Sequence, residues 1–135
     1  MEQAYHFLAL SGVFTVLMWV PYILSRLFVW GIGDFLKNYP KGYPAQEPTP
    51  PLWAQRAKRA HLNMVETLPA FVAVVMAAAM LPERIDPAFV GQCAMVFYYA
   101  RVAHYIVYAL GVPYLRTPTY LVSWAAILAI GFQLT

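Results

Sequence analysis

The sequence predicts an all-α fold: a bundle of four helices that span a membrane. The first observation is composition, since 61% of the 135 residues are hydrophobic and only 11% are charged, whereas about a quarter of a soluble domain is charged. The second is the arrangement of the apolar residues in four long runs separated by polar loops. So few charges cannot cover a water-facing surface, and the runs are long enough to cross a bilayer.

The first apolar segment covers about residues 4–30. It is longer than a cleaved signal peptide and lacks a basic start, because Glu2 is the only charged residue before Arg26. We therefore predict a retained helix. Pro21 predicts a kink in it, with Ser25 and neighbouring helices binding the carbonyl that proline frees.

The other three segments cover about residues 56–81, 87–112 and 117–135. A membrane-spanning helix needs about 20 residues, so the last segment only just suffices. The single cysteine, Cys93, excludes an internal disulfide and predicts a packed, unreactive thiol. We predict a single membrane domain over residues 1–135.

Basic residues are concentrated in two of the loops. The loop after the third segment holds Arg116, and the amino terminus has no Lys or Arg. The long loop at residues 31–55 and the start of the second segment hold five: Lys37, Lys41, Arg56, Lys58 and Arg59. Because Lys and Arg in short loops mark the cytoplasmic side, we predict that both loops are cytoplasmic and that both termini lie on the opposite side.

The long loop is rich in proline, which favours extended segments. It is either a solvated connector, or a segment that lies along the lipid headgroups or folds over a site. The chain has no phosphate-binding loop and no zinc-ligand spacing, so we predict no metal site. Membrane topology explains the basic residues better than nucleic-acid binding does.

Two sets of polar side chains interrupt the second and third segments. At about 1.5 Å of rise per residue the sets fall at matching depths, and each set lies on one helical face. They are Arg59, Asn63 and Glu66 in the second segment, and Tyr108, His104 and Arg101 in the third. A lone charge near the bilayer centre costs about 2.5–3.5 kcal/mol, so we expect Glu66 and Arg101 to pair. The pair either fixes helix register or anchors a polar ligand site that opens to the cytoplasm.

Arg26 ends the first segment at the depth of the opening of this site. It is either an interfacial anchor or part of the site. An arginine-rich cavity suits a ligand with carboxylates, which a guanidinium binds with two parallel hydrogen bonds.

The polar segments resemble the signatures of a known family, the membrane-associated proteins of eicosanoid and glutathione metabolism (MAPEG). The stretch "RAHLNMVETLPAF" is similar to the family's Arg-Ala-His-x-Asn-x-x-Glu-Thr pattern, and "ARVAHYIVYALGVPYLRTP" to its Arg-x-x-His-x-x-x-Tyr followed by Leu-Arg. The chain length, the four segments and the long first loop agree with the family over the whole chain.

The resemblance implies a homotrimer of four-helix bundles with glutathione bound between neighbouring subunits. The residues that would line this site are Arg59, Asn63, Glu66, Arg101, His104 and Tyr108, with Arg26 reaching in from the adjacent subunit. Two positions depart from the eicosanoid-type members. Leu62 replaces an arginine on the second segment, and Tyr120 replaces the arginine that would stabilise the thiolate.

We therefore expect a glutathione-dependent transferase or peroxidase that acts on lipophilic electrophiles. Glutathione is the co-substrate, and the hydrophobic small-molecule substrate arrives through the membrane lipids. Arg101 and Tyr120 are the candidate catalytic residues, because a cation or hydroxyl donor lowers the pKa of a thiol. The alternative is a non-enzymatic glutathione- or lipid-binding membrane protein of the same family. The expected location is a bacterial inner membrane.

Two other classes fit the sequence less well. A small proton-coupled exporter would carry an intramembrane acid on its first helix, and here no acid follows Glu2 before residue 30. A haem protein would use His61 and His104 on facing helices, but the two histidines differ in depth.

Overall fold

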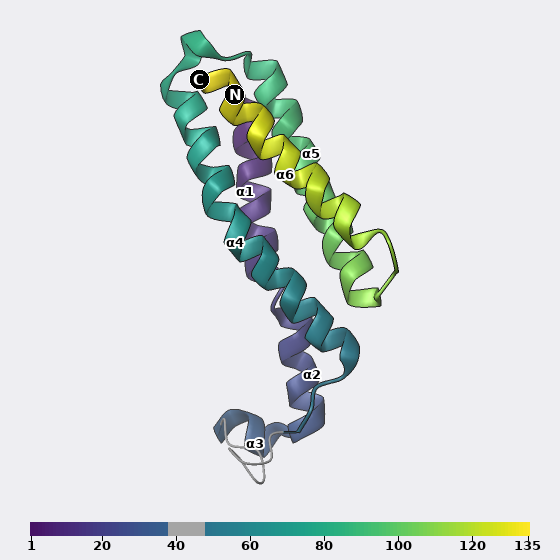
Figure 1. Ribbon diagram of the computed structural model, residues 1–135. Helices are drawn as coiled ribbons and strands as arrows, with labels where there is room; N and C mark the ends of the chain where they lie inside the picture. Colours follow the sequence, from purple (N-terminus) through teal and green to yellow (C-terminus); the bar gives the residue numbers. More distant parts are fainter. Residues whose placement is uncertain (38–47) are drawn as a thin grey trace.

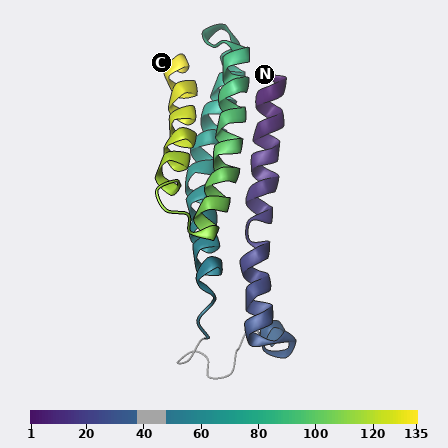
Figure 2. The same ribbon diagram turned by 90° about the vertical axis from the view of Figure 1, so that its right-hand side faces the viewer.

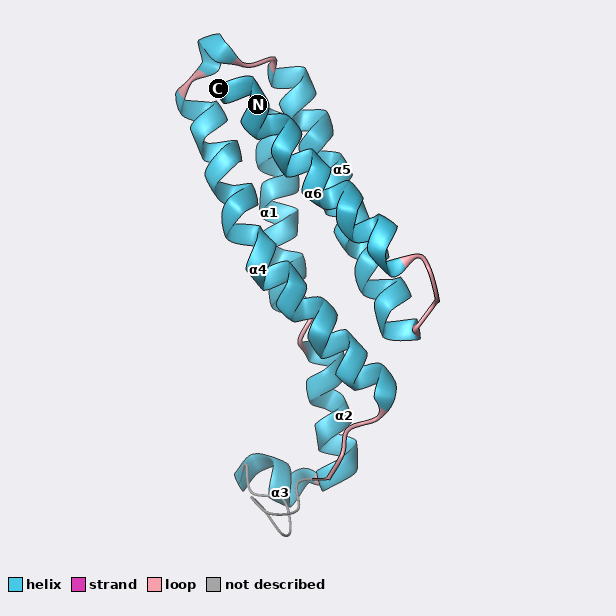
Figure 3. Ribbon diagram, in the orientation of Figure 1, coloured by secondary structure: helices cyan, strands magenta, loops and turns pink. Residues whose placement is uncertain are grey.

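The prediction of four apolar helical spans is confirmed by a computed structural model that describes residues 1–37 and 48–135 (Figures 1 and 3). The described residues contain helices, turns and loops, and no strand. The first span consists of two helices end to end, and the others are single helices: α1 (Glu2–Leu17) with α2 (Val20–Trp30), α4 (Leu52–Met80), α5 (Pro87–Leu110) and α6 (Arg116–Leu134).

The first span breaks at Met18 and Trp19, just before Pro21, as the predicted kink requires. Proline has no N–H to donate and so interrupts the helical hydrogen bonds. The Tyr105 hydroxyl of α5 donates to the Met18 carbonyl at 3.0 Å, so a neighbouring helix contacts the break one residue after Leu17, whose carbonyl Pro21 frees. The predicted part for Ser25 is wrong, because its hydroxyl donates instead to the Tyr22 carbonyl at 2.7 Å.

The second span begins earlier than predicted, directly after Pro51. Proline is well suited to the start of a helix because its φ is already fixed near the helical value. The N–H that it lacks would have no partner within the helix at that position. The Gln55 side chain donates to the Pro50 carbonyl at 2.8 Å and so ties the first turn of α4 to the residues before it. The predicted loop also contains a short helix, α3 (Ile32–Lys37). The proline- and tyrosine-rich part of that loop at residues 38–47 lies outside the described residues.

The connection between α4 and α5 is tied to the end of the chain. It contains a short 3-10 helix, η1 (Pro82–Arg84). The Arg84 guanidinium donates to the Leu134 carbonyl at 3.3 Å, and the Gln133 side chain accepts from the amide of Asp86 at 3.2 Å. Asp86 also caps α5 by accepting from the Ala88 amide at 2.9 Å. The end of α6 is thereby held against the α4–α5 connection.

The termini lie together at one end of the bundle, and α3 and the start of α4 lie towards the other (Figures 1 and 2). Helix α5 contacts α1, α4 and α6, and α1 and α6 each also contact α4. The α5–α6 turn lies towards the same end as α3 and the start of α4 (Figures 1 and 2). The described parts of both loops that we predict to be cytoplasmic therefore lie towards one end of the bundle, and the side of the membrane that this end faces stays a prediction.

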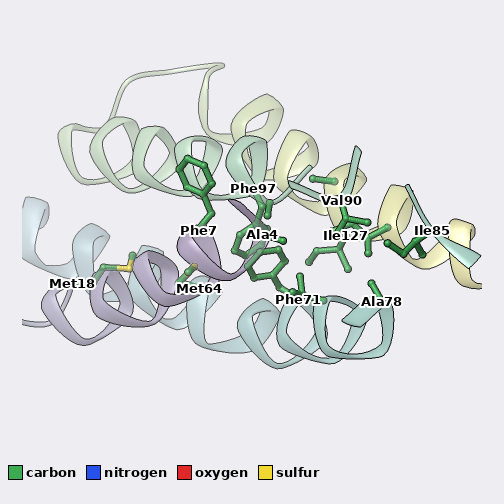
Figure 4. Close-up of a cluster of buried hydrophobic side chains, with 14 residues drawn as sticks. Ala4, Phe7, Met18, Met64, Phe71, Ala78, Ile85, Val90, Phe97 and Ile127 are labelled. Atoms are coloured by element: carbon green, nitrogen blue, oxygen red, sulfur yellow. The ribbon is translucent and has the colours of Figure 1, made fainter. Parts of the chain in front are cut away.

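Aromatic stacking joins α4 to α5 in the middle of the bundle. The rings of Phe71 and Phe97 are fully buried and stack with centroids 3.9 Å apart, and Figure 4 shows them inside the cluster of buried apolar side chains. Large apolar side chains also cover the outer surface, among them Phe28, Met80 and Phe132, which are between 72% and 83% exposed. An outer surface of this kind suits contact with lipid chains rather than with water.

Candidate ligand-binding site

Arg101 is the most deeply buried charged side chain among the described residues, with 1% of its surface exposed. Its Nη2 donates to the Thr67 hydroxyl on α4. The guanidinium carbon lies 4.8 Å from the centre of the Tyr120 ring and 5.6 Å from that of Phe97. Its Nε and Nη1 are buried and have no hydrogen-bond partner among the described residues. A buried guanidinium with unused donors is costly, so a negative charge placed nearby would offset part of that cost.

The predicted pairing of Arg101 with Glu66 within one chain is wrong. Glu66 is exposed on the outer face of α4, and the neighbouring residue Thr67 takes its place opposite Arg101. Consecutive residues of an α-helix differ by about 100° in direction. The depth of the expected contact was therefore correct to one residue, but the carboxylate points to another side.

His104 is 1% exposed and links α5 to the start of α6. Its Nδ1 lies 3.0 Å from the Arg116 carbonyl and 3.3 Å from the Thr119 hydroxyl. Because a carbonyl oxygen only accepts, Nδ1 carries the proton in this arrangement. The Nε2 atom is buried without a partner among the described residues. The ring contacts those of Tyr108 and Tyr120, with centroids 5.5 Å and 5.8 Å away.

A cavity of about 320 Å³ opens beside His104, and we call it the inner cavity. Four of the eight predicted site residues line it, together with two residues from the start of α6. The lining residues are Asn63, His104, Tyr108, Tyr120, Arg116 and Thr117. The side chains offer an amide, an imidazole, three hydroxyls and one guanidinium, and none of them is acidic. Such a set can hold a polar ligand with a negative charge.

The predicted set did not include Arg116, although its guanidinium lies 5.0 Å above the Tyr108 ring. The sequence contained a signal for it. Arg116 is the one cation between the third and fourth segments, and it follows Tyr108 by eight residues. A tight turn at Gly111, which has φ of 72°, folds α6 back so that Arg116 returns to the face that carries Tyr108.

Arg26 and Arg59 line a different cavity, of about 720 Å³, between α2 and α4. Leu62, the first departure from the family pattern, also lines it. The Arg26 guanidinium lies 4.8 Å above the Trp30 ring. Within one chain the structure therefore brings Asn63, His104, Tyr108 and Tyr120 together, and it places Arg26 and Arg59 elsewhere.

His61 and His104 do not face a common site within the chain. His61 Nδ1 lies 2.9 Å from the Tyr22 hydroxyl of α2, whereas His104 contacts the start of α6. Between residues 1–37 and 48–135, no group of three or more His, Cys, Asp or Glu side chains is placed to hold a metal ion.

The fold and the site define a polytopic helical membrane protein with a polar cavity near one end of its bundle. Comparison with protein families matches residues 4–135 to the MAPEG family. The chain thus belongs to the MAPEG family and is an integral membrane protein. A search of curated proteins found no match.

Proposed function

We propose that the protein is a membrane-bound, glutathione-dependent transferase or peroxidase that acts on lipophilic electrophiles. The observation that carries the proposal is that two nitrogens of buried Arg101, Nε and Nη1, have no hydrogen-bond partner among the described residues. Arg101 contacts the ring of Tyr120, which borders the inner cavity. A thiolate held near Tyr120 would place a negative charge beside this guanidinium and so offset the cost of its burial.

The side chains of the inner cavity have distinct parts in this proposal. The Tyr120 hydroxyl donates to the sulfur, and Arg101 stabilises its negative charge from behind the ring. Asn63 and His104 bind the peptide groups of glutathione, and Tyr108 with Arg116 stands at the opening. The lipophilic substrate enters from the lipid between helices.

The chemistry balances with glutathione as the only co-reactant. In the transferase reaction the thiolate attacks an electrophilic carbon, a carbon–sulfur bond forms, and the leaving group departs with the electron pair of its bond. In the peroxidase reaction two glutathione molecules reduce a hydroperoxide to an alcohol and water, and they are oxidised to the disulfide. Thiolate formation is the step that the protein must assist in both reactions.

We further propose that the site is completed in a homotrimer. Two cavities with basic side chains lie in different parts of one chain, one between α2 and α4 and the other beside the start of α6. In an assembly, Arg26 and Arg59 of one copy can approach the inner cavity of the next, and Glu66, exposed on α4, is free to meet a charge on a neighbouring copy or the ligand's amine. Chemical cross-linking in membranes, resolved by mass, tests the trimer directly.

The test of activity uses purified protein with glutathione and two substrates, 1-chloro-2,4-dinitrobenzene and a lipophilic hydroperoxide. We expect conjugation or reduction that depends on protein concentration and is lost in Arg101→Met. Measurable glutathione binding with no turnover of either substrate would reject the activity for these substrates.

The second candidate is a non-enzymatic binding protein of the same family. Tyr120 favours it, because a neutral hydroxyl stabilises a thiolate less than a guanidinium in the same place does. The two candidates differ in thiolate formation. If the protein is an enzyme, the ultraviolet absorbance of the glutathione thiolate should increase when glutathione binds. If the protein only binds glutathione and keeps the thiol protonated, this absorbance should not change.

We propose a bacterial inner membrane as the location, with the end of α2, the start of α4 and the α5–α6 turn in the cytoplasm. The placement of these ends on one side of the bundle supports it, together with their basic residues (Figure 2). Glutathione from the cytosol would then reach the inner cavity without crossing the membrane.

A further inference from the structure

A second cavity of about 380 Å³ adjoins the inner cavity, and we call it the outer cavity. The two cavities share three lining residues, Tyr108, Arg116 and Thr117. The outer cavity extends from these residues to Arg56, on the first turns of α4, and to the turn after α5. The two cavities therefore meet at these shared residues, and Arg56 lines the outer one.

Arg56 lies directly against the backbone at Gly111. A Cβ atom at position 111 would overlap the guanidinium of Arg56, and the φ of 72° at this position is one that other residues rarely adopt. Glycine thus makes the tight turn and also leaves the space that the guanidinium occupies. The result is a half-buried arginine held at the wall of the outer cavity.

The outer cavity is strongly basic. Arg56 and Arg116 line it together, and no acidic side chain is among its lining residues. Helix α6 begins at Arg116, so the positive end of its dipole borders the same space. Stacking on the Tyr108 ring holds the Arg116 guanidinium in place. Two guanidinium groups and a helix N-terminus together favour a carboxylate.

We infer that the outer cavity binds the glycine carboxylate of glutathione, with Arg56 as a specificity-determining residue. This inference rests on the proposed function, in which the thiol lies in the inner cavity. Glutathione has a carboxylate at each end, but only the γ-glutamyl carboxylate has an ammonium group on the same carbon. Two arginines with no acidic neighbour would repel that ammonium, whereas the glycine carboxylate carries no positive group.

The experiment compares glutathione with its glycine monoethyl ester, which keeps the thiol and the γ-glutamyl end but loses the glycine charge. Dissociation constants are measured by calorimetry for the full-length protein in detergent or lipid nanodiscs. We expect the wild type to bind glutathione about tenfold more tightly than the ester, since a charge-assisted hydrogen bond has about this effect. In Arg56→Gln we expect the two constants to become equal, mainly through weaker binding of glutathione.

Two further variants make the comparison specific. Arg84→Gln removes the same charge beside the end of α6, where Arg84 donates to the Leu134 carbonyl, and we expect it to keep the wild-type ratio. Arg56→Lys retains the charge without the planar donors, and we expect an intermediate ratio. Because the ratio compares two ligands on one sample, a partly unfolded preparation does not change it.

An Arg56→Gln ratio equal to that of the wild type, with glutathione still bound, would overturn the assignment and leave the proposed function standing. A wild-type protein that binds the ester as tightly as glutathione would do the same. A wild-type protein that binds neither ligand would overturn the proposed function as well.

Discussion

The guanidinium of Arg101 on α5 donates a hydrogen bond to the hydroxyl of Thr67 on α4, in the interior of the bundle. Thr67 accepts this bond while its own hydroxyl proton is directed to the backbone carbonyl of Asn63, 2.9 Å away. The contact joins two helices where the sequence suggested an ion pair. It leaves Arg101 without a carboxylate partner among the described residues, and the first two predictions follow from that arrangement.

Thr67→Val keeps the shape of the side chain and removes its hydroxyl. The Nη2 atom of Arg101 then lacks a partner, as Nε and Nη1 already do. We therefore expect a loss of about 1–3 kcal/mol in the free energy of unfolding. Thermal unfolding in detergent measures the change. The control is Thr15→Val, because the Thr15 hydroxyl donates only to the Ser11 carbonyl of its own helix. Equal losses in the two variants would show that the contact between helices contributes nothing.

Arg101→Met removes a buried charge that pairs with no acidic side chain in the described part of the chain. Replacing such a charge with an apolar side chain of similar length is often neutral or stabilising. We therefore expect an unchanged or raised unfolding midpoint, together with at least a tenfold weaker affinity for glutathione. A loss of stability with unchanged affinity would assign Arg101 a purely structural part.

Tyr120→Phe separates ligand binding from thiolate formation. The ring and its contact with Arg101 remain, and only the hydroxyl at the inner cavity is lost. If the hydroxyl donates to the sulfur, turnover should fall about tenfold while the dissociation constant of glutathione changes little. Steady-state rates with 1-chloro-2,4-dinitrobenzene provide the measurement. Tyr5→Phe, on the exposed face of α1, is the matched control.

Phe71→Ala tests the stacked pair in the core. The loss comes from packing contacts and from the cavity left against Phe97, because lipid and not water is the alternative environment of a spanning helix. We expect the free energy of unfolding to fall by about 2–4 kcal/mol, which chemical unfolding in mixed micelles can resolve. Phe132→Ala removes the same ring from a site that is 72% exposed, and should change stability by less than about 0.5 kcal/mol.

Tyr105→Phe tests the break in the first span. It removes the hydroxyl that donates to the Met18 carbonyl, and we expect a loss of about 0.5–1.5 kcal/mol. Hydrogen exchange should rise locally at the junction of α1 and α2. The Tyr99 hydroxyl makes no hydrogen bond within the described residues, so Tyr99→Phe should leave the exchange unchanged. A uniform rise across all four spans would argue against a local effect.

Several features could be predicted from the sequence by itself. Apolar runs of sufficient length predict the spans, because a helix satisfies its own backbone in lipid and few other structures do. Pro21 predicts the break, because its missing N–H is a local property. The rise per residue predicts the depth of each side chain in the membrane. The residue of α4 that contacts Arg101 could therefore be predicted to within one position.

Rotation of one helix against another was decided only by the tertiary structure. The spacing of polar residues shows that they share a face of their own helix, but it does not show which neighbour that face meets. Packing turned Thr67 to Arg101 and left Glu66 on the surface. It also separated Arg26 and Arg59 from Asn63, and the turn at Gly111 returned Arg116 to the site. These outcomes depend on contacts between segments distant in sequence, which no local pattern encodes.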